Sequence, residues 1–188
     1  MKSPVFRYCS CSIAVALAFF ALAHCVSVSA QTADQEKTMT KSESVLLKKW
    51  IGPYGGVPPW RQVKTDEFVD AFEAAFELHD IEIDAIADNP EPPTFENTIV
   101  ALEQSGRTLN QIETIFGVYA SNLNTGVIPD LEKAIGPKLS KHSDSVTQNE
   151  TLFMRVEKVY QDNLGEGATT QLDEAQQRLL KDRYTGFV

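Results

Sequence analysis

The sequence has few cysteines, few basic side chains and no long hydrophobic run. The three cysteines in its 188 residues are Cys9, Cys11 and Cys25. The chain after position 30 therefore offers no disulfide, no thiol nucleophile and no cysteine-ligated metal. Basic residues number 17 against 26 acidic ones, a net charge of −9. Because nucleic-acid-binding proteins neutralise phosphates with clustered lysine and arginine, this balance argues against a nucleic-acid partner.

Residues 1–30 have the layout of a secretory signal peptide. Lys2 and Arg7 precede an apolar run at residues 13–22, and small residues at 28–30 form a plausible cleavage site. The run is shorter than the ~20 apolar residues of a membrane-spanning helix. The sequence therefore predicts an exported protein, periplasmic or secreted, without stable membrane insertion once the signal has been removed.

Two other processing routes stay open for this segment. One is an uncleaved N-terminal anchor, which the short apolar run disfavours. The other is a lipoprotein acylated at Cys25, for which His24 is a poor preceding residue. Because the first 30 residues hold two basic and no acidic side chains, cleavage after Ala30 leaves 158 residues with a net charge of −11.

The next two segments are predicted to be a linker and an arm. Residues 31–44 are almost entirely polar and have little to bury, which predicts a flexible linker. Residues 45–64 mix aromatic residues with glycine and proline, which disfavours a regular helix or central strand. An extended arm pinned by its aromatic residues is the favoured interpretation. Trp50 and Trp60 are expected to fasten this arm to the domain, with a ligand-stacking surface as the alternative.

From residue 65 onward, apolar residues recur every three or four positions, as they do on the buried face of a helix. No alternating strand of useful length occurs. The sequence therefore predicts an all-α fold, with a partial helical domain over residues 65–188. About five helices are expected, at residues 65–88, 94–123, 129–146, 149–164 and 170–184.

Capping and helix-breaking residues predict where these helices begin and end. Thr65, Thr94 and Asn149 are expected to cap helix N-termini, and Thr170 to open the last helix. Pro129 suits a first helical turn.

Three further local features predict details of the helices. Gly106 interrupts an apolar stripe, which predicts close approach of a neighbouring backbone, and Pro137 is expected to kink or interrupt its helix. Because the last helix is still patterned at Tyr184, close to the end of the sequence, we expect it to be cut in mid-element. That pattern favours a fragment of a longer protein.

Residues able to carry chemistry are sparse. His79 has no second histidine or carboxylate four residues on, so a packed, hydrogen-bonded histidine is favoured over a metal ligand. The triplet at residues 142–144 contains the residue types of a serine triad, but adjacent positions cannot converge on one another. The acidic residues at 70–73 and 77–84 point around the helix and indicate a solvated face. We therefore expect no catalytic, cofactor-binding or metal-binding residue in this chain.

Residues 89–106, NPEPPTFENTIVALEQSG, resemble the N-terminal region of the thimet-oligopeptidase-like zinc peptidases of family M3. Within that family they are most similar to bacterial peptidyl-dipeptidases, also called dipeptidyl carboxypeptidases. The aromatic arm at 53–60 and the run at 70–73 resemble the corresponding opening segments. Residues 149–156 and 179–188 continue the resemblance, which covers about residues 45–188.

The resemblance implies a fold and a reaction. The fold is the antiparallel helical N-terminal region of a neurolysin-like peptidase, which forms one wall of a channel that admits short, unfolded peptides. The complete enzyme holds one zinc ion through a His-Glu-x-x-His motif and a downstream glutamate, and hydrolyses peptides by metal-activated water. That motif does not occur in the 188 residues, so no catalytic or metal-binding residue is carried over.

The sequence therefore predicts the N-terminal portion of an exported zinc metallopeptidase that releases C-terminal dipeptides. Its partners are short peptides as substrate and the missing catalytic half of the same chain. The chain alone is expected to bind no zinc and to be inactive. The alternative is a free-standing helical interaction or inhibitory module derived from such a peptidase.

Overall fold

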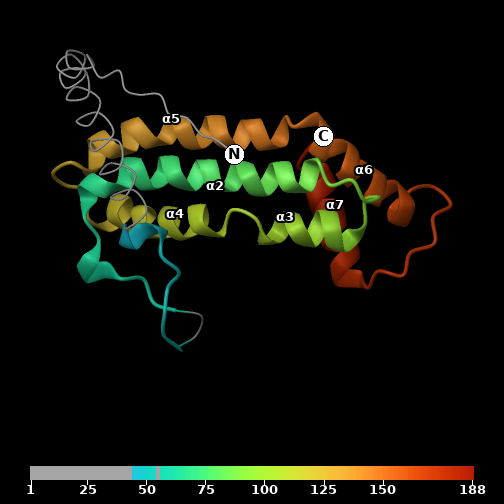
Figure 1. The fold of residues 1–188 in the computed structure, drawn as a ribbon, viewed down its shortest axis with the longest axis horizontal. Coiled ribbons are helices and arrows are strands. Elements are labelled where there is room, and N and C mark those ends of the chain that lie inside the picture. The colour runs from blue at the N-terminus through green and yellow to red at the C-terminus, as the bar shows by residue number, and fades with distance from the viewer. Residues whose placement is uncertain (1–43, 54–55) are drawn as a thin grey trace, which may run out of the picture. The chain divides into compact units, whose positions relative to one another are not determined.

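The computed structural model describes residues 44–53 and 56–188 (Figure 1). The predicted signal peptide and almost all of the predicted linker lie outside these residues. Contacts divide the chain into two units, Met1–Thr40 and Lys41–Val188. The description that follows concerns the second unit.

The second unit is helical, which confirms the all-α prediction. Its only β-type pairing among the described residues is an isolated antiparallel bridge between Ile51 and Val57. No helix in the described part of the chain is long and apolar enough to cross a membrane. The α-helices are α2 (Phe68–Ala87), α3 (Ala101–Gln104), α4 (Arg107–Asn122), α5 (Ile128–Thr147), α6 (Glu150–Leu164) and α7 (Glu174–Thr185). A π-helical turn, Phe95–Val100, leads into α3, and short 3-10 helices form at Val45–Leu47, Trp60–Gln62 and Thr65–Glu67.

Helix α2 is the central element, with α5 along one side of it and α3 and α4 along the other (Figure 1). The largest core cluster forms among α2, α4 and α5. In this cluster Phe72 and Phe68 are almost fully buried and pack edge-to-face on Phe116, with ring centroids 5.5 and 5.1 Å apart. Each buried aromatic side chain removes a large apolar area from water, so this cluster supplies much of the stabilisation.

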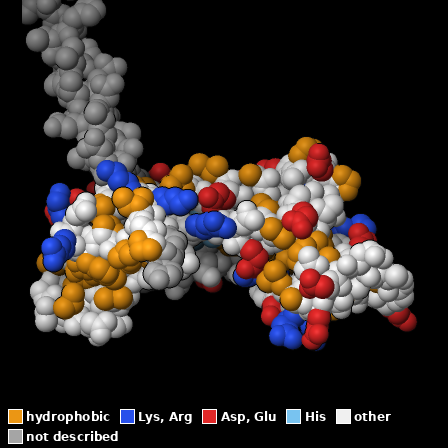
Figure 2. Space-filling model, turned by 90° about the horizontal axis from the view of Figure 1, so that it is seen from below, with side chains coloured by type: hydrophobic (Ala, Val, Ile, Leu, Met, Phe, Trp, Pro, Cys, Tyr) orange, Lys and Arg blue, Asp and Glu red, His pale blue; other side chains and the backbone are white. Residues whose placement is uncertain are grey.

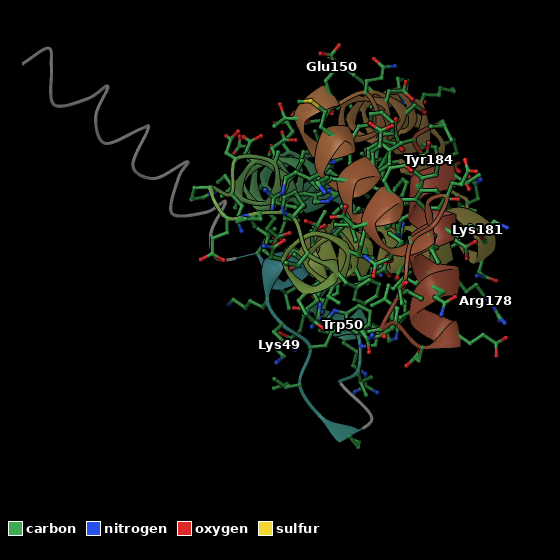
Figure 3. All side chains as sticks on the ribbon, turned by 90° about the vertical axis from the view of Figure 1, so that its right-hand side faces the viewer. Lys49, Trp50, Glu150, Arg178, Lys181 and Tyr184 are labelled. Atoms are coloured by element: carbon green, nitrogen blue, oxygen red, sulfur yellow. The ribbon has the colours of Figure 1, made fainter. Side chains whose placement is uncertain are left out.

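A second core cluster joins the π-helical turn to α6 and α7. Leu180 of α7 is fully buried, and Tyr184 stacks on Tyr160 of α6 with centroids 4.1 Å apart. Arg178 and Lys181 of the same helix are exposed at its outer edge, whereas Tyr184 is half-buried (Figure 3). This division between faces explains why α7 docks although its sequence is mostly polar.

Four of the predicted helix boundaries are confirmed, two of them by capping hydrogen bonds. The Thr94 hydroxyl accepts a bond from Asn97 N–H, and the Asn97 side-chain oxygen accepts one from Thr94 N–H, which completes a capping box. Asn149 caps α6 by accepting from Leu152 N–H, and α6 ends before Gly165 as expected. Pro129 lies in the first turn of α5.

Two predicted helix starts are wrong. Thr65 begins a 3-10 turn and makes no capping bond, and α2 starts only at Phe68. The start of α7 is capped by Asp173 rather than Thr170, because Asp173 and Gln176 form a reciprocal capping box. The Thr170 hydroxyl instead donates to Asn163 and accepts from Leu172 N–H.

Two further expectations are corrected. The helix predicted over 94–123 is broken, because Gly106 adopts a left-handed conformation (φ +67°) between α3 and α4. Pro137 lies inside α5 without interrupting it. Helix α7 ends at Thr185, and Gly186 N–H bonds to the carbonyls of Asp182 and Arg183.

Part of the predicted arm, residues 45–64, contacts the helical core. Leu46 is fully buried in the largest core cluster, and Trp50 packs against that cluster. Trp60 lies near Tyr119 of α4, with ring centroids 6.4 Å apart. Ile51 and Val57 remain exposed, and Figure 2 shows hydrophobic side chains gathered at the end of the described unit that carries the arm.

Candidate functional site

Two histidines from different helices meet beside a cavity of the described unit. His79 lies on the inward side of α2 and is half-buried, and His142 on α5 is 9% exposed. Their facing ring nitrogens, His79 Nδ1 and His142 Nε2, are 2.9 Å apart, within hydrogen-bonding distance. The His142 ring also packs on Phe76, with centroids 4.7 Å apart. The expectation that His79 is a packed, hydrogen-bonded histidine is confirmed.

The outer nitrogen of each ring also has an oxygen partner. His79 Nε2 lies 3.3 Å from the Ser105 hydroxyl, which itself donates to the Leu102 carbonyl at 2.8 Å. His142 Nδ1 lies 3.5 Å from a carboxylate oxygen of Asp80. The result is a continuous polar chain from Asp80 through both imidazoles to Ser105. Its members come from α2, α5 and the break after α3.

The helix break at Gly106 positions this series of polar contacts from Asp80 to Ser105. A Cβ on Gly106 would lie 3.1 Å from the His79 ring, and its positive φ disfavours any other residue. Its N–H donates to the Glu82 carboxylate at 2.6 Å, one turn along α2 from His79. Gly106 therefore allows a close approach as predicted, but to an imidazole ring rather than to a backbone.

The cavity beside the histidines has a volume of about 450 Å³. It is lined by both histidines and by residues of α3, α4, α5 and α7. Charged groups around it are mostly acidic: Glu103, Glu113 and Asp182 line it, while Arg183 pairs with Glu103. Together with Asp80 and Glu82 on α2, these side chains give the site an excess of negative charge.

Burial and neighbouring charge shift two ionisation equilibria at this site. Desolvation lowers the pKa of His79, and the charge of His142 lowers it further, against the opposing effect of Glu82 and Asp80. Desolvation raises the pKa of Glu113, which lines the cavity from α4. Both shifts favour the neutral side chain, as a partly enclosed cavity does.

The sequence reasoning missed the meeting of the two histidines. They lie 63 residues apart, and neither has a ligand partner at helical spacing. Ser143 and Asp144 are exposed while His142 is buried, so the triplet at 142–144 does not converge. The acidic side chains Asp70, Glu77, Asp80, Glu82 and Asp84 are exposed, in agreement with a solvated face. Among the described residues, no three or more His, Cys, Asp or Glu side chains are grouped to hold a metal ion.

Two known proteins that are similar to this chain are both dipeptidyl carboxypeptidases. The chain is 30% identical over 147 residues to the dipeptidyl carboxypeptidase of Salmonella typhimurium, a match that covers 78% of this chain and 21% of that protein. It is 30% identical over 152 residues to the dipeptidyl carboxypeptidase of Escherichia coli, covering 80% of this chain and 21% of the relative. No protein-family model matches the chain. Most of this chain is therefore similar to a segment that makes up about a fifth of each of these dipeptidyl carboxypeptidases.

Proposed function

We propose that this chain is the N-terminal helical region of an exported zinc peptidase that releases C-terminal dipeptides from short, unfolded peptides. The observation that carries the proposal is the 30% identity to two dipeptidyl carboxypeptidases over about four fifths of the chain. The all-helical second unit is compatible with the helical region that the sequence resemblance implies. The predicted signal peptide supports export.

In this proposal the chain contributes a wall of the substrate channel and no catalytic group. Exposed apolar residues on α2, Leu78 at 46% and Ile81 at 65%, supply a surface against which the remainder of a longer peptidase can pack. The residues described here do not fit the enzyme's zinc, because the His-Glu-x-x-His motif is missing from the sequence and no cluster of three ligands forms. We therefore assign no step of the hydrolysis to this chain.

The test compares the 188-residue chain with the product of the longest reading frame that contains it. Both are incubated with an N-terminally blocked tripeptide, with and without a chelator, and the released dipeptide is measured. We expect chelator-sensitive release that zinc restores from the longer product, and none from the 188-residue chain, which lacks the zinc motif.

Two results would contradict the proposal. One is chelator-sensitive release by the 188-residue chain alone. The other is a reading frame that stops directly after Val188, with no dipeptide release, which favours a free-standing interaction or inhibitory module instead. A tripeptide with an amidated C-terminus is the control, because release of a C-terminal dipeptide is expected to need the free carboxylate.

A further inference from the structure

His79 and His142 are joined by a hydrogen bond between their facing ring nitrogens. His79 Nδ1 and His142 Nε2 lie 2.9 Å apart, and the two ring centroids are 5.0 Å apart. In such a bond one nitrogen donates its proton and the other accepts it with a lone pair. The pair keeps this bond when it is neutral or carries one added proton, since a charged donor still meets a neutral acceptor. With two added protons the bond is lost, because both nitrogens of a charged imidazole are donors.

We propose that this hydrogen bond is an acid-sensitive latch between α2 and α5. It holds the two helices together beside the cavity at neutral pH, and it breaks when the second imidazole takes up a proton. Two N–H groups then face each other, and two positive charges repel one another. The latch consists of this chain's own residues, so it does not depend on the proposed peptidase function.

The two rings are held on their other sides by close packing. His142 is 9% exposed, and its ring packs on Phe76 of α2 with centroids 4.7 Å apart. The His79 ring lies against Gly106, where a Cβ would be 3.1 Å from it, and His79 Nε2 is 3.3 Å from the Ser105 hydroxyl. Moving either ring gives up these contacts. We therefore expect double protonation to loosen the packing of α5 on α2 around His142.

Charged side chains around the pair favour one added proton without changing the limit on the second. Asp80 has a carboxylate oxygen 3.5 Å from His142 Nδ1, and carboxylates at this range stabilise a positive imidazole. The charged groups that face the pair or its cavity are Asp80 and Glu82 on α2, Glu103 on α3, Glu113 on α4, and Asp182 and Arg183 on α7, while Lys141 and Asp144 of α5 itself are exposed. Arg183 pairs with Glu103. The hydrogen bond itself involves only the two rings.

Two shifted ionisation equilibria agree with the latch in sign. Burial lowers the pKa of His79, and the charge of His142 lowers it further, so His79 resists a proton while its partner is charged. Burial raises the pKa of Glu113, so this cavity carboxylate loses its negative charge at a higher pH than an ordinary glutamate. Because the closed pair binds the second proton more weakly than separated rings do, falling pH favours the separated state.

The test follows the histidine rings and the backbone amides of the full 188-residue chain by NMR, from neutral to mildly acidic pH. The background is His24→Gln, which removes the other histidine and leaves only the two ring signals of the pair. We expect coupled titration in two steps separated by at least about one pH unit. Across the second step, amide exchange in residues 138–146 of α5 should accelerate at least about tenfold beyond its intrinsic pH dependence, because one unit of pKa shift corresponds to a factor of ten. Amides of α6 are the internal reference and should show no such change.

Variants separate the latch from the general effect of acid. His142→Gln and His79→Gln each leave one ring, which should titrate in a single step, and the acid-induced exchange in α5 should disappear. In His142→Gln the pKa of His79 should rise relative to the background chain, because the charge of His142 no longer lowers it while burial still does. The control is Asp84→Asn, an exposed carboxylate on α2 outside the pair, which should keep both titration steps and the exchange response.

Three results would overturn the proposal. They are titration of both rings in one uncoupled step, unchanged exchange of the α5 amides across the second step, and equal acid-induced exchange in folded His79→Gln and His142→Gln variants. If a variant fails to fold, the ring titration and the exchange profile of the His24→Gln chain still decide the question, since either one alone can contradict the latch.

Discussion

Two of the buried polar side chains of the described unit, Arg155 and His142, differ in how their polar groups are satisfied. Arg155 on α6 is 7% exposed and donates to the carbonyls of Asn89 and Glu91, at 2.8 and 3.1 Å, and to the Asn97 side chain at 3.1 Å. These acceptors are neutral dipoles held in place by the proline-rich loop and its capping box. Arg155 keeps its proton at all ordinary pH values, so it serves as a permanent clamp between this loop and α6.

The His79–His142 pair lacks that permanence. Its facing ring nitrogens, His79 Nδ1 and His142 Nε2, are hydrogen-bonded at 2.9 Å, and which of them donates depends on the tautomers of the two rings. The pair also borders a cavity, whereas Arg155 is enclosed by its acceptors. The comparison teaches that fixed dipoles of the backbone and of one side-chain amide can hold a buried charge, whereas the contact within the histidine pair depends on the tautomers of the two rings.

The largest loss of stability is expected when Arg155, the clamp between the proline-rich loop and α6, is replaced. Arg155→Met leaves the Asn89 and Glu91 carbonyls and the Asn97 side chain without their buried donor, and should lower the free energy of unfolding by about 2–4 kcal/mol. Urea unfolding of both proteins at neutral pH measures this difference in the free energy of unfolding.

The matched control for this change is Arg178→Met on α7, since Arg178 is 72% exposed and forms only an i,i+4 pair with Glu174. It should change stability by less than about 0.5 kcal/mol. Equal costs for the two substitutions would show that the Arg155 bonds contribute nothing beyond an exposed pair.

A smaller effect is expected at Gly106, which belongs to the histidine region. Gly106→Ala introduces a Cβ at a φ of +67° and 3.1 Å from the His79 ring, and should cost about 1–2 kcal/mol. It should also shift the ring signals of His79 in an NMR spectrum.

Gly126→Ala separates the two causes of that cost. Gly126 has a similar φ of +61° but no atom within 4 Å of its Cβ position, so only backbone strain of about 1 kcal/mol applies. The excess cost at Gly106 then reports the contact with His79. An equal cost at both positions, with unmoved His79 signals, would refute the close packing.

The smallest effect is the dependence of stability on pH. Burial and the charge of His142 hold the pKa of His79 below the ordinary value of 6.5 that the unfolded chain keeps. The unfolded state therefore binds more protons as pH falls below about 6.5. The contribution of His79 to stability is fully present above that value and is lost as pH falls towards its folded-state pKa.

Urea unfolding between neutral and mildly acidic pH measures this dependence. His79→Gln should flatten it, whereas Arg155→Met should leave its slope unchanged, because arginine does not titrate in this range. A steeper loss of stability in His79→Gln than in the unmodified chain would contradict the assignment.

Local chemistry made the helical part of the fold predictable. Thr94 and Asn149 cap helices because their short oxygen-bearing side chains reach backbone donors two or three residues away. The prediction that Thr170 opens the last helix is wrong because Asp173, three residues on, caps that helix and forms a capping box with Gln176. Pro137 is tolerated inside α5 although its local preference opposes a helix, since the packing of α5 against α2 outweighs that preference.

The candidate site could not be predicted in the same way. Its residues, Asp80, Ser105 and His142, are spread over α2, the break after α3, and α5. No spacing rule relates positions that meet only when helices pack side by side. Gly106 gave a partial signal, because a glycine on an apolar helical stripe indicates that something approaches closely.

The sequence alone determined that this chain is helical, where three of its helical segments begin, and which peptidases it resembles, because caps, apolar periodicity and motif order are written in nearby residues. Tertiary structure alone decided that two histidines 63 residues apart point their ring nitrogens at one another beside a cavity. The physical reason is that the packing of α5 against α2, rather than any local preference, brings the two rings together.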